Sequence, residues 1–111
     1  MLENQIDDVS ALLKAISHPM RLRALCLLLE GEKTVGELRD TVQTTTANIS
    51  QHLGVLRNRG IVTTTKEANF IYNRIADHRM AALVDTLQDL FCDIGEVRKE
   101  GDRIQKKGDA S

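Results

Sequence analysis

The residues between Thr44 and Arg59 carry side chains suited to hydrogen bonding with nucleic acid rather than to catalysis. At helical spacing, one side of this stretch would present Ala47, Asn48, Gln51 and His52. Asparagine and glutamine can make paired hydrogen bonds to an adenine edge, and a small alanine lets a helix approach closely. Hydroxyl groups that can contact phosphate oxygens are supplied by Thr45, Thr46 and Ser50. These residue types predict a helix that contacts bases in a DNA major groove, although taken alone they also fit an ordinary solvated helix.

The other side of the same stretch is apolar, which a helix of a folded domain requires. Its apolar residues recur at helical spacing and would face the core: Ile49, Leu53 and Leu56. Either Thr45 or Thr46 can supply the N-cap oxygen, and Gly60 suits the C-terminal cap. We therefore predict one short helix over 45–59 with its polar face outward.

The two cysteines are the other reactive groups, and they stand far apart in the chain. Cys26 falls on the apolar face of a predicted helix, where cysteine is a common core residue. Cys92 lies at the margin of a later apolar stripe, where a reagent could reach it. Its neighbours Asp89 and Asp93 disfavour a thiolate, which leaves open what would activate an attacking thiol. The residues alone favour structural cysteines over a thiol-based sensor.

Three helices must precede the stretch at 44–59 to position it. Apolar spacing predicts a first helix over 9–16, which Ser17-His18-Pro19 interrupts. Pro19 suits the first turn of a second helix, which ends near 30–32. Thr34 and Glu37 form a capping-box pattern that opens a short third helix. Only a brief turn separates this third helix from the fourth, and this arrangement predicts a helix-turn-helix.

A change of period after Gly60 predicts a β-hairpin. The β-branched run 61–65 and the alternating run 70–75 are typical of strands, with a polar turn over 66–69 between them. A hairpin directly after a DNA-contacting helix is a wing, whose basic residues Lys66 and Arg74 would contact the DNA backbone. A hairpin that only covers the core is the alternative.

The last predicted helix, which Asp77 can cap, carries more apolar residues than a small domain needs. They are Met80, Leu83, Val84, Leu87, Leu90, Phe91 and Ile94. We expect this stripe to pack both on the body and on a partner subunit. Residues 95–111 are charged and contain several glycines, and we predict a frayed helix end and a flexible tail there. The fold predicted for 1–94 is mostly α with a small β-hairpin, a winged helix-turn-helix of order α-α-α-α-β-β-α that forms a homodimer.

The charge balance is unusual for a protein that binds DNA, because such domains are generally basic. The chain has 15 basic and 16 acidic residues, for a formal net charge of −1. The two signs are segregated, however. Acid is frequent in the first ten residues and in 85–102, whereas Arg57, Arg59, Lys66 and Arg74 surround the predicted DNA-contacting helix. The local positive charge around this helix therefore still favours binding to a polyanion such as DNA.

Several function classes lack support in the sequence. No Ser/His/Asp or Cys/His arrangement and no glycine-rich phosphate loop is evident, so we expect neither an enzyme nor a cofactor. No segment approaches the roughly 18 apolar residues of a membrane span, and the acidic start 1–8 is unlike a signal peptide. We therefore expect a cytoplasmic protein with no membrane partner. A protein–protein adaptor that uses the same fold without DNA remains an alternative, against which Asn48, Gln51 and His52 argue.

Over residues 10–94 the chain resembles the ArsR/SmtB family of winged-helix repressors. The most specific pieces are Ser17-His18-Pro19 with Arg21-Leu22, Val35-Gly36-Glu37-Leu38, and Ser50-Gln51-His52-Leu53 leading to Leu56-Arg57 and Gly60-Ile61-Val62. The resemblance implies a homodimer built from the first and last helices. It also implies double-stranded operator DNA with two-fold symmetry as the partner, bound without inducer and released with it.

The residues expected for the family's metal sites are missing. The third helix holds no cysteine where arsenic-type members carry a CxC motif, and Asp77-His78-Arg79 departs from the zinc-type Asp-x-His pair. Cys26 and Cys92, in the settings LRALCLLLEGE and LQDLFCDIGE, instead resemble the SqrR/BigR group of persulfide sensors. This resemblance implies that reactive sulfur species are the inducer. They would bridge the two thiols as a di- or polysulfide and weaken DNA binding. A metal- or general oxidant-responsive repressor that uses the same thiols is the alternative.

Overall fold

The computed structural model contains five helices and one hairpin within the part of the chain it describes. Backbone and side chains are described for residues 1–91, and residues 92–100 as helix only. The elements are α1 (Glu3–Ile16), α2 (Pro19–Leu29), α3 (Val35–Val42), α4 (Thr46–Asn58), β1 (Val62–Glu67), β2 (Phe70–Ile75) and α5 (His78–Glu100). The predicted fold class and element order are confirmed. Residues 101–111 of the predicted tail lie outside the described residues.

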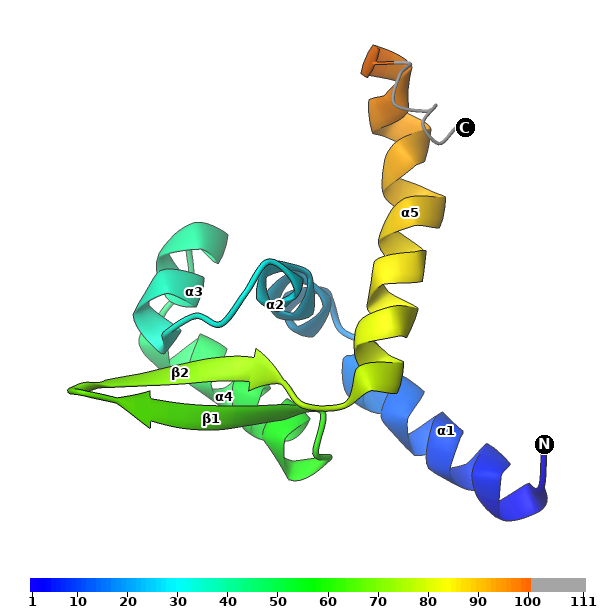
Figure 1. Ribbon diagram of the computed structural model, residues 1–111, viewed down its shortest axis with the longest axis horizontal. Helices are drawn as coiled ribbons and strands as arrows, with labels where there is room; N and C mark the ends of the chain where they lie inside the picture. The colour runs from blue at the N-terminus through cyan, green and yellow to red at the C-terminus, as the bar shows by residue number, and fades with distance from the viewer. Residues whose placement is uncertain (101–111) are drawn as a thin grey trace.

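The core lies between α2, α4 and the start of α5. It consists of Ala15, Ile16, Ala24, Leu25, Leu28, Leu38, Ile49, Leu53, Leu56, Ile61, Val62, Met80 and Val84. The apolar face predicted for the fourth helix is confirmed, because Ile49, Leu53 and Leu56 are all fully buried. In Figure 1, α1 and α5 occupy one side of the molecule, and the hairpin extends away toward the other.

Local capping signals account for most of the helix ends. Thr34 and Glu37 form the predicted capping box at the start of α3. At the end of α4, Gly60 takes a positive φ of 74°. The N–H of Ile61 donates to the carbonyl of Leu56 over 3.0 Å, and that of Gly60 to Arg57 over 3.0 Å. This pair of bonds is the Schellman arrangement, in which a glycine without a Cβ avoids left-handed strain.

Two elements differ in length from the sequence prediction. α1 begins at Glu3 rather than at residue 9, because the Gln5 side chain accepts a hydrogen bond from the Leu2 N–H over 2.7 Å and caps the extra turns. β1 continues to Glu67, so the hairpin turn contains only Ala68 and a following asparagine. Ala68 has a φ of 57°, the left-handed conformation that such tight turns demand.

The hairpin is tied to the body at its second strand. β1 and β2 pair antiparallel, with Val62 opposite Ile75 at the base and Glu67 opposite Phe70 at the tip. Lys33, in the connection between α2 and α3, forms an isolated bridge with Asn73 of β2. This bridge fixes the middle of β2 beside the connection that leads into α3.

Candidate nucleic-acid interface

α4 presents a polar face opposite its buried leucines. Thr45 is the N-cap, and its hydroxyl accepts a hydrogen bond from the Asn48 N–H over 3.0 Å, which confirms one of the two predicted caps. The Asn48 side chain is half-buried and donates from Nδ2 to Thr44 Oγ1 over 2.9 Å. Ala47 and Gln51 are exposed. The start of α4 is therefore held by its own hydroxyl groups, while one face stays open to a partner.

The two remaining hydroxyl residues of the predicted interface have different surroundings. Thr46 is exposed and accepts a hydrogen bond from Arg39 Nη1 of α3 over 3.0 Å, and Ser50 is half-buried. Arg39 also donates from Nε to Asp40 Oδ1 over 2.8 Å, a bond that lowers the pKa of the Asp40 carboxyl. Sequence reasoning missed Arg39, which brings a cation to the N-terminus of α4. The signal available was the short turn that folds α3 back on α4.

His52 is half-buried beside the start of α2, and its predicted contact with bases stays a prediction. The ring is half-buried, and its Nδ1 lies 3.2 Å from Nη1 of Arg21 on α2. Its centroid is 4.3 Å from the centroid of His18, the N-cap of α2. Burial, followed by the charges of His18 and Arg21, lowers the pKa of His52. The imidazole therefore links α4 to the start of α2.

The hairpin carries both predicted wing residues on its surface. Lys66 is exposed, and Arg74 is exposed and donates from Nε to Thr65 Oγ1 across the strands over 3.3 Å. Near the tip the hairpin also exposes two large apolar side chains, Phe70 and Ile71, which are 58% and 54% exposed. β1 packs directly against α4, so the basic wing residues belong to the same structural unit as the polar helix face.

The structure brings the helices of the two cysteines together without describing both thiols. Cys26 is half-buried on α2, beside the core. Cys92 lies within α5, but its side chain is outside the described residues. α2 packs against α5. The pairing of Cys26 with Cys92 thus stays a prediction.

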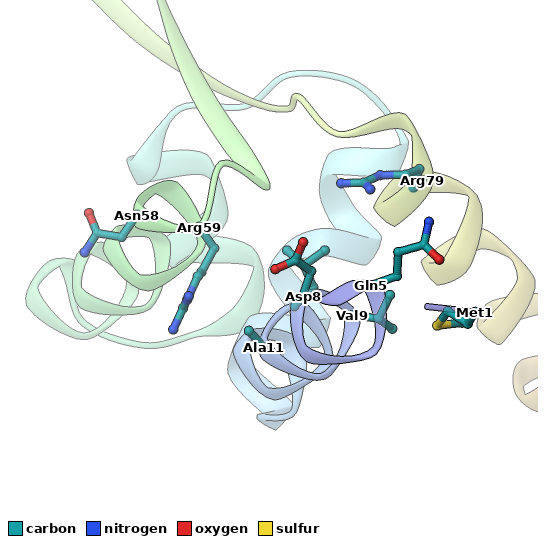
Figure 2. Close-up of a pocket in the computed structure, with 9 residues that line it drawn as sticks. Met1, Gln5, Asp8, Val9, Ala11, Asn58, Arg59 and Arg79 are labelled. Atoms are coloured by element: carbon teal, nitrogen blue, oxygen red, sulfur yellow. The ribbon is translucent and has the colours of Figure 1, made fainter. Parts of the chain in front are cut away.

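An open cleft of about 570 Å³ separates α1 from the end of α4 and the start of α5. Figure 2 shows Asp8 of α1 between Arg59 and Arg79. Within the described part of the chain, no three His, Cys, Asp or Glu side chains gather in a way that could hold a metal ion. No helix there is long and apolar enough to cross a membrane.

Two helices expose large apolar side chains on their surfaces. On α1, Ile6, Val9 and Leu13 are 41%, 36% and 45% exposed. On α5, Leu90 and Phe91 are 59% and 67% exposed, beyond the buried start of that helix. The side chain of Ile94, the last member of the predicted stripe, lies outside the described residues. Apolar faces of this kind mark surfaces that associate with a partner.

Known proteins share both the sequence pattern and the architecture. A family profile described as "Bacterial regulatory protein, arsR family" matches residues 18–64. The biofilm growth-associated repressor of Xylella fastidiosa is 42% identical over 91 residues, which cover 82% of this chain and 80% of that protein. The transcriptional activator HlyU of Vibrio cholerae is 36% identical over 91 residues, which cover 82% of this chain and 84% of that protein.

Solved structures agree with these matches. The transcriptional repressor BigR from Xylella fastidiosa has a TM-score of 0.75 and 42% identity, covering 81% of this chain and 92% of that one. The reduced form of HlyU from Vibrio cholerae has a TM-score of 0.78 and 36% identity, covering 81% of this chain and 95% of that one. A homodimeric winged helix-turn-helix domain from Mycobacterium bovis has a TM-score of 0.73 and 27% identity, covering 82% of this chain and 84% of that one. On these similarities together with the winged helix-turn-helix built around α4, the chain belongs to the ArsR family of bacterial regulatory proteins.

Proposed function

We propose that the protein is a homodimeric transcriptional repressor in which α4 enters the major groove of operator DNA. The observation that carries this proposal is the two-sided character of α4, with Ile49, Leu53 and Leu56 fully buried and Gln51 exposed opposite them. Thr45, Thr46 and Ser50 would contact phosphates, and Ala47, Asn48, Gln51 and His52 would contact bases. Lys66 and Arg74 would hold the adjacent backbone from the wing.

The apolar faces of α1 and α5 support the dimer. Two copies joined there would present two α4 helices to successive major grooves, about 34–36 Å apart along one face of DNA. The homodimeric relative from Mycobacterium bovis has the same fold, which favours this arrangement. An operator with two-fold symmetry follows from such a dimer. Acting on chromosomal DNA, the dimer would work in the cytoplasm.

Binding to a duplex selected by the protein from random DNA tests this role. Gln51→Ala should lower the affinity for that duplex about 5- to 150-fold, since one paired base contact contributes about 1–3 kcal/mol. Asn58→Ala is the matched control, because Asn58 is on the same helix but lines the cleft beside α1. A parent protein that selects no duplex would refute DNA binding, and an affinity that does not change with salt would refute the phosphate contacts, because such contacts release counterions. Transcription in vitro from a promoter carrying the duplex distinguishes repression from activation.

We propose further that Cys26 and Cys92 sense reactive sulfur species. One thiolate would attack the sulfane sulfur of a persulfide donor, forming a cysteine persulfide and releasing the donor's thiol. The second thiolate would then attack the inner sulfur of that persulfide, closing a disulfide and expelling hydrosulfide. The sulfane sulfur is thereby reduced to sulfide while the two cysteines are oxidised. If both cysteines are first persulfidated, the same displacement leaves a trisulfide.

The packing of α2 against α5 supports a mechanical consequence of that bridge. α2 also contacts α4 through Arg21 and His52. A covalent bridge between α2 and α5 would therefore alter the position of α4, the helix proposed to contact DNA. Allosteric couplings of about 1–3 kcal/mol are typical, and this range corresponds to roughly 5- to 150-fold weaker binding. The relative from Vibrio cholerae was solved in a form described as reduced, which fits a family in which oxidation state matters.

Mass spectrometry with parallel binding measurements tests the sensor. A polysulfide donor should link Cys26 to Cys92 and weaken duplex binding, with the mass loss of two hydrogens for a disulfide or the mass gain of retained sulfur for a trisulfide. Cys26→Ser and Cys92→Ser should each bind the duplex like the parent, and the donor should not weaken their binding. A Cys92→Ser variant that still responds would refute the sensing role. Equal responses to peroxide would favour a general oxidant sensor, and stoichiometric binding of added zinc or copper would favour a metal sensor.

A further inference from the structure

The contact between Arg21 and His52 determines which nitrogen of the imidazole carries the proton. Arg21 Nη1 lies 3.2 Å from His52 Nδ1, within hydrogen-bond distance. A guanidinium has five N–H donors and no acceptor, so it can only donate. Nδ1 must therefore accept through its lone pair, and in the neutral ring the proton resides on Nε2.

Arg21 is itself held in place, so the contact is a fixed feature of the fold. Its Nε donates to the carbonyl of Ala15, in the last turn of α1, over 2.6 Å. The side chain is half-buried beside the start of α2. On its other side, the His52 ring stacks on His18 at 4.3 Å with an angle of 36° between the planes. Two neighbours, Arg21 of α2 and the N-cap residue His18, thus fix the orientation of the ring.

Nε2 of His52 remains available to a partner. Among the described residues, Asn73 Oδ1 is the one buried side-chain polar atom without a hydrogen bond. Nε2 has no partner in the described part of the chain and is not among the buried atoms, so it reaches solvent. A ring in this tautomer offers solvent an N–H donor and no acceptor.

We propose that Arg21 is a positioning residue that makes His52 a dedicated hydrogen-bond donor on the DNA-contacting face of α4. The proposal rests on the proposed function, because it assigns chemistry to the interface that α4 would form with DNA. The partner atom must be an acceptor. On DNA this atom is a phosphate oxygen or an acceptor on a base edge, such as purine N7, guanine O6 or thymine O4. The exocyclic amino groups of adenine and cytosine are excluded because they only donate.

Two-bond ¹H–¹⁵N spectra of the imidazole rings test the tautomer in the free protein. The parent should show His52 with its proton on Nε2 alone, and Arg21→Met should introduce a population protonated on Nδ1. Arg21→Met should also raise the pKa of His52, because the guanidinium charge lowers it. Arg23→Met is the matched control, since Arg23 is exposed on the same helix, whereas the arginine that contacts His52 is Arg21. Arg21→Lys retains a donor and should restore the parent tautomer in part.

Affinity for a duplex selected by the parent protein tests the consequence. Arg21→Met should bind that duplex about 2- to 12-fold more weakly, the range expected for one hydrogen bond, while Arg23→Met loses less. Substituting 7-deazapurines in the duplex should erase the difference in affinity between the parent and Arg21→Met if the acceptor is N7. Methylphosphonate linkages should erase it if the acceptor is a phosphate.

Three results would overturn the proposal. They are a parent ring protonated on Nδ1, an unchanged tautomer in Arg21→Met, and unchanged affinity of that variant. The first needs no variant, so it decides the matter even if Arg21→Met does not fold. A parent that binds no duplex would refute the proposed function instead, whatever its tautomer.

Discussion

Asp77 accepts three hydrogen bonds from Arg79 at the start of α5. Its Oδ1 accepts from the Arg79 backbone N–H over 2.9 Å and from Nε over 3.0 Å, and its Oδ2 accepts from Nη2 over 2.7 Å. The side-chain hydrogen bond from Arg79 is the main cause that lowers the pKa of Asp77 to about 2. The carboxylate thus both caps α5 and pairs with a residue of its first turn, as predicted for the cap.

The Asp77 carboxylate should make the folding stability depend on pH in the acid range. Because the folded pKa lies below the unfolded value of about 3.9, the unfolded chain binds the proton more readily. The stabilisation is therefore fully present above pH 4 and is lost as pH falls through about 2. Asp77→Asn keeps a cap but removes the charge, so its thermal midpoint should change less between pH 5 and pH 2. Asp85→Asn, an exposed change on the same helix, should follow the parent.

His52 should contribute a second pH dependence, nearer neutrality. Burial and the charges of His18 and Arg21 lower its pKa in the folded protein, so the unfolded chain binds this proton more readily. The stabilisation is present above the unfolded pKa of about 6.5 and is lost as pH falls through the folded value. Below pH 6.5 the thermal midpoint of His52→Gln should change less with pH than that of the parent. The same change with pH in both proteins would contradict the role given to His52.

The N-cap of α4 should contribute to stability as well as to DNA binding. Thr45→Ala removes the oxygen that accepts from the Asn48 N–H, and should lower the free energy of unfolding by about 1 kcal/mol in urea titrations. Thr45→Ser retains the acceptor and should cost only a few tenths of that. If alanine and serine behave alike, the cap is not what holds this helix end.

The buried amide of Asn73 should be replaceable by an apolar side chain. Asn73 is 1% exposed, and its Oδ1 has no partner among the described residues. Its Nδ2 donates to the Lys33 carbonyl over 3.3 Å, but that carbonyl already accepts from the Asn73 N–H over 2.7 Å. Asn73→Leu should therefore raise the free energy of unfolding by up to about 1 kcal/mol, since an orphaned polar atom is removed. Asn73→Asp should lower it by about 3 kcal/mol or more at pH 7, because a buried carboxylate would lack a partner.

The apolar faces of α1 and α5 should hold the dimer together. Leu13→Glu combined with Phe91→Glu places charge on both faces and should convert the protein to monomers in sedimentation experiments. Phe70→Glu combined with Ile71→Glu alters two equally exposed apolar residues at the wing tip and should leave the dimer intact. Monomers from the wing-tip variant and dimers from the other would place the interface at the hairpin.

The sequence by itself determined which elements form and most of their ends. Caps such as Thr34, Thr45 and Asp77, the stop at Gly60, and the apolar period of α4 act over a few residues, so they can be recognised without knowing the fold. Even the two errors of length, at the start of α1 and in the hairpin turn, concerned boundaries rather than the existence of an element.

Only the tertiary structure decided which side chains meet. Arg21 and His52 are 31 residues apart, and Lys33 and Asn73 are 40 apart, so their contacts exist only because α2, α4 and the hairpin converge on one core. Hydrogen bonds need partners within about 3.5 Å, a precision that periodicity does not supply. For this reason the sequence could predict that His52 belongs to a polar helix that contacts DNA, while the fold alone fixed the hydrogen-bond donor that its ring would offer there.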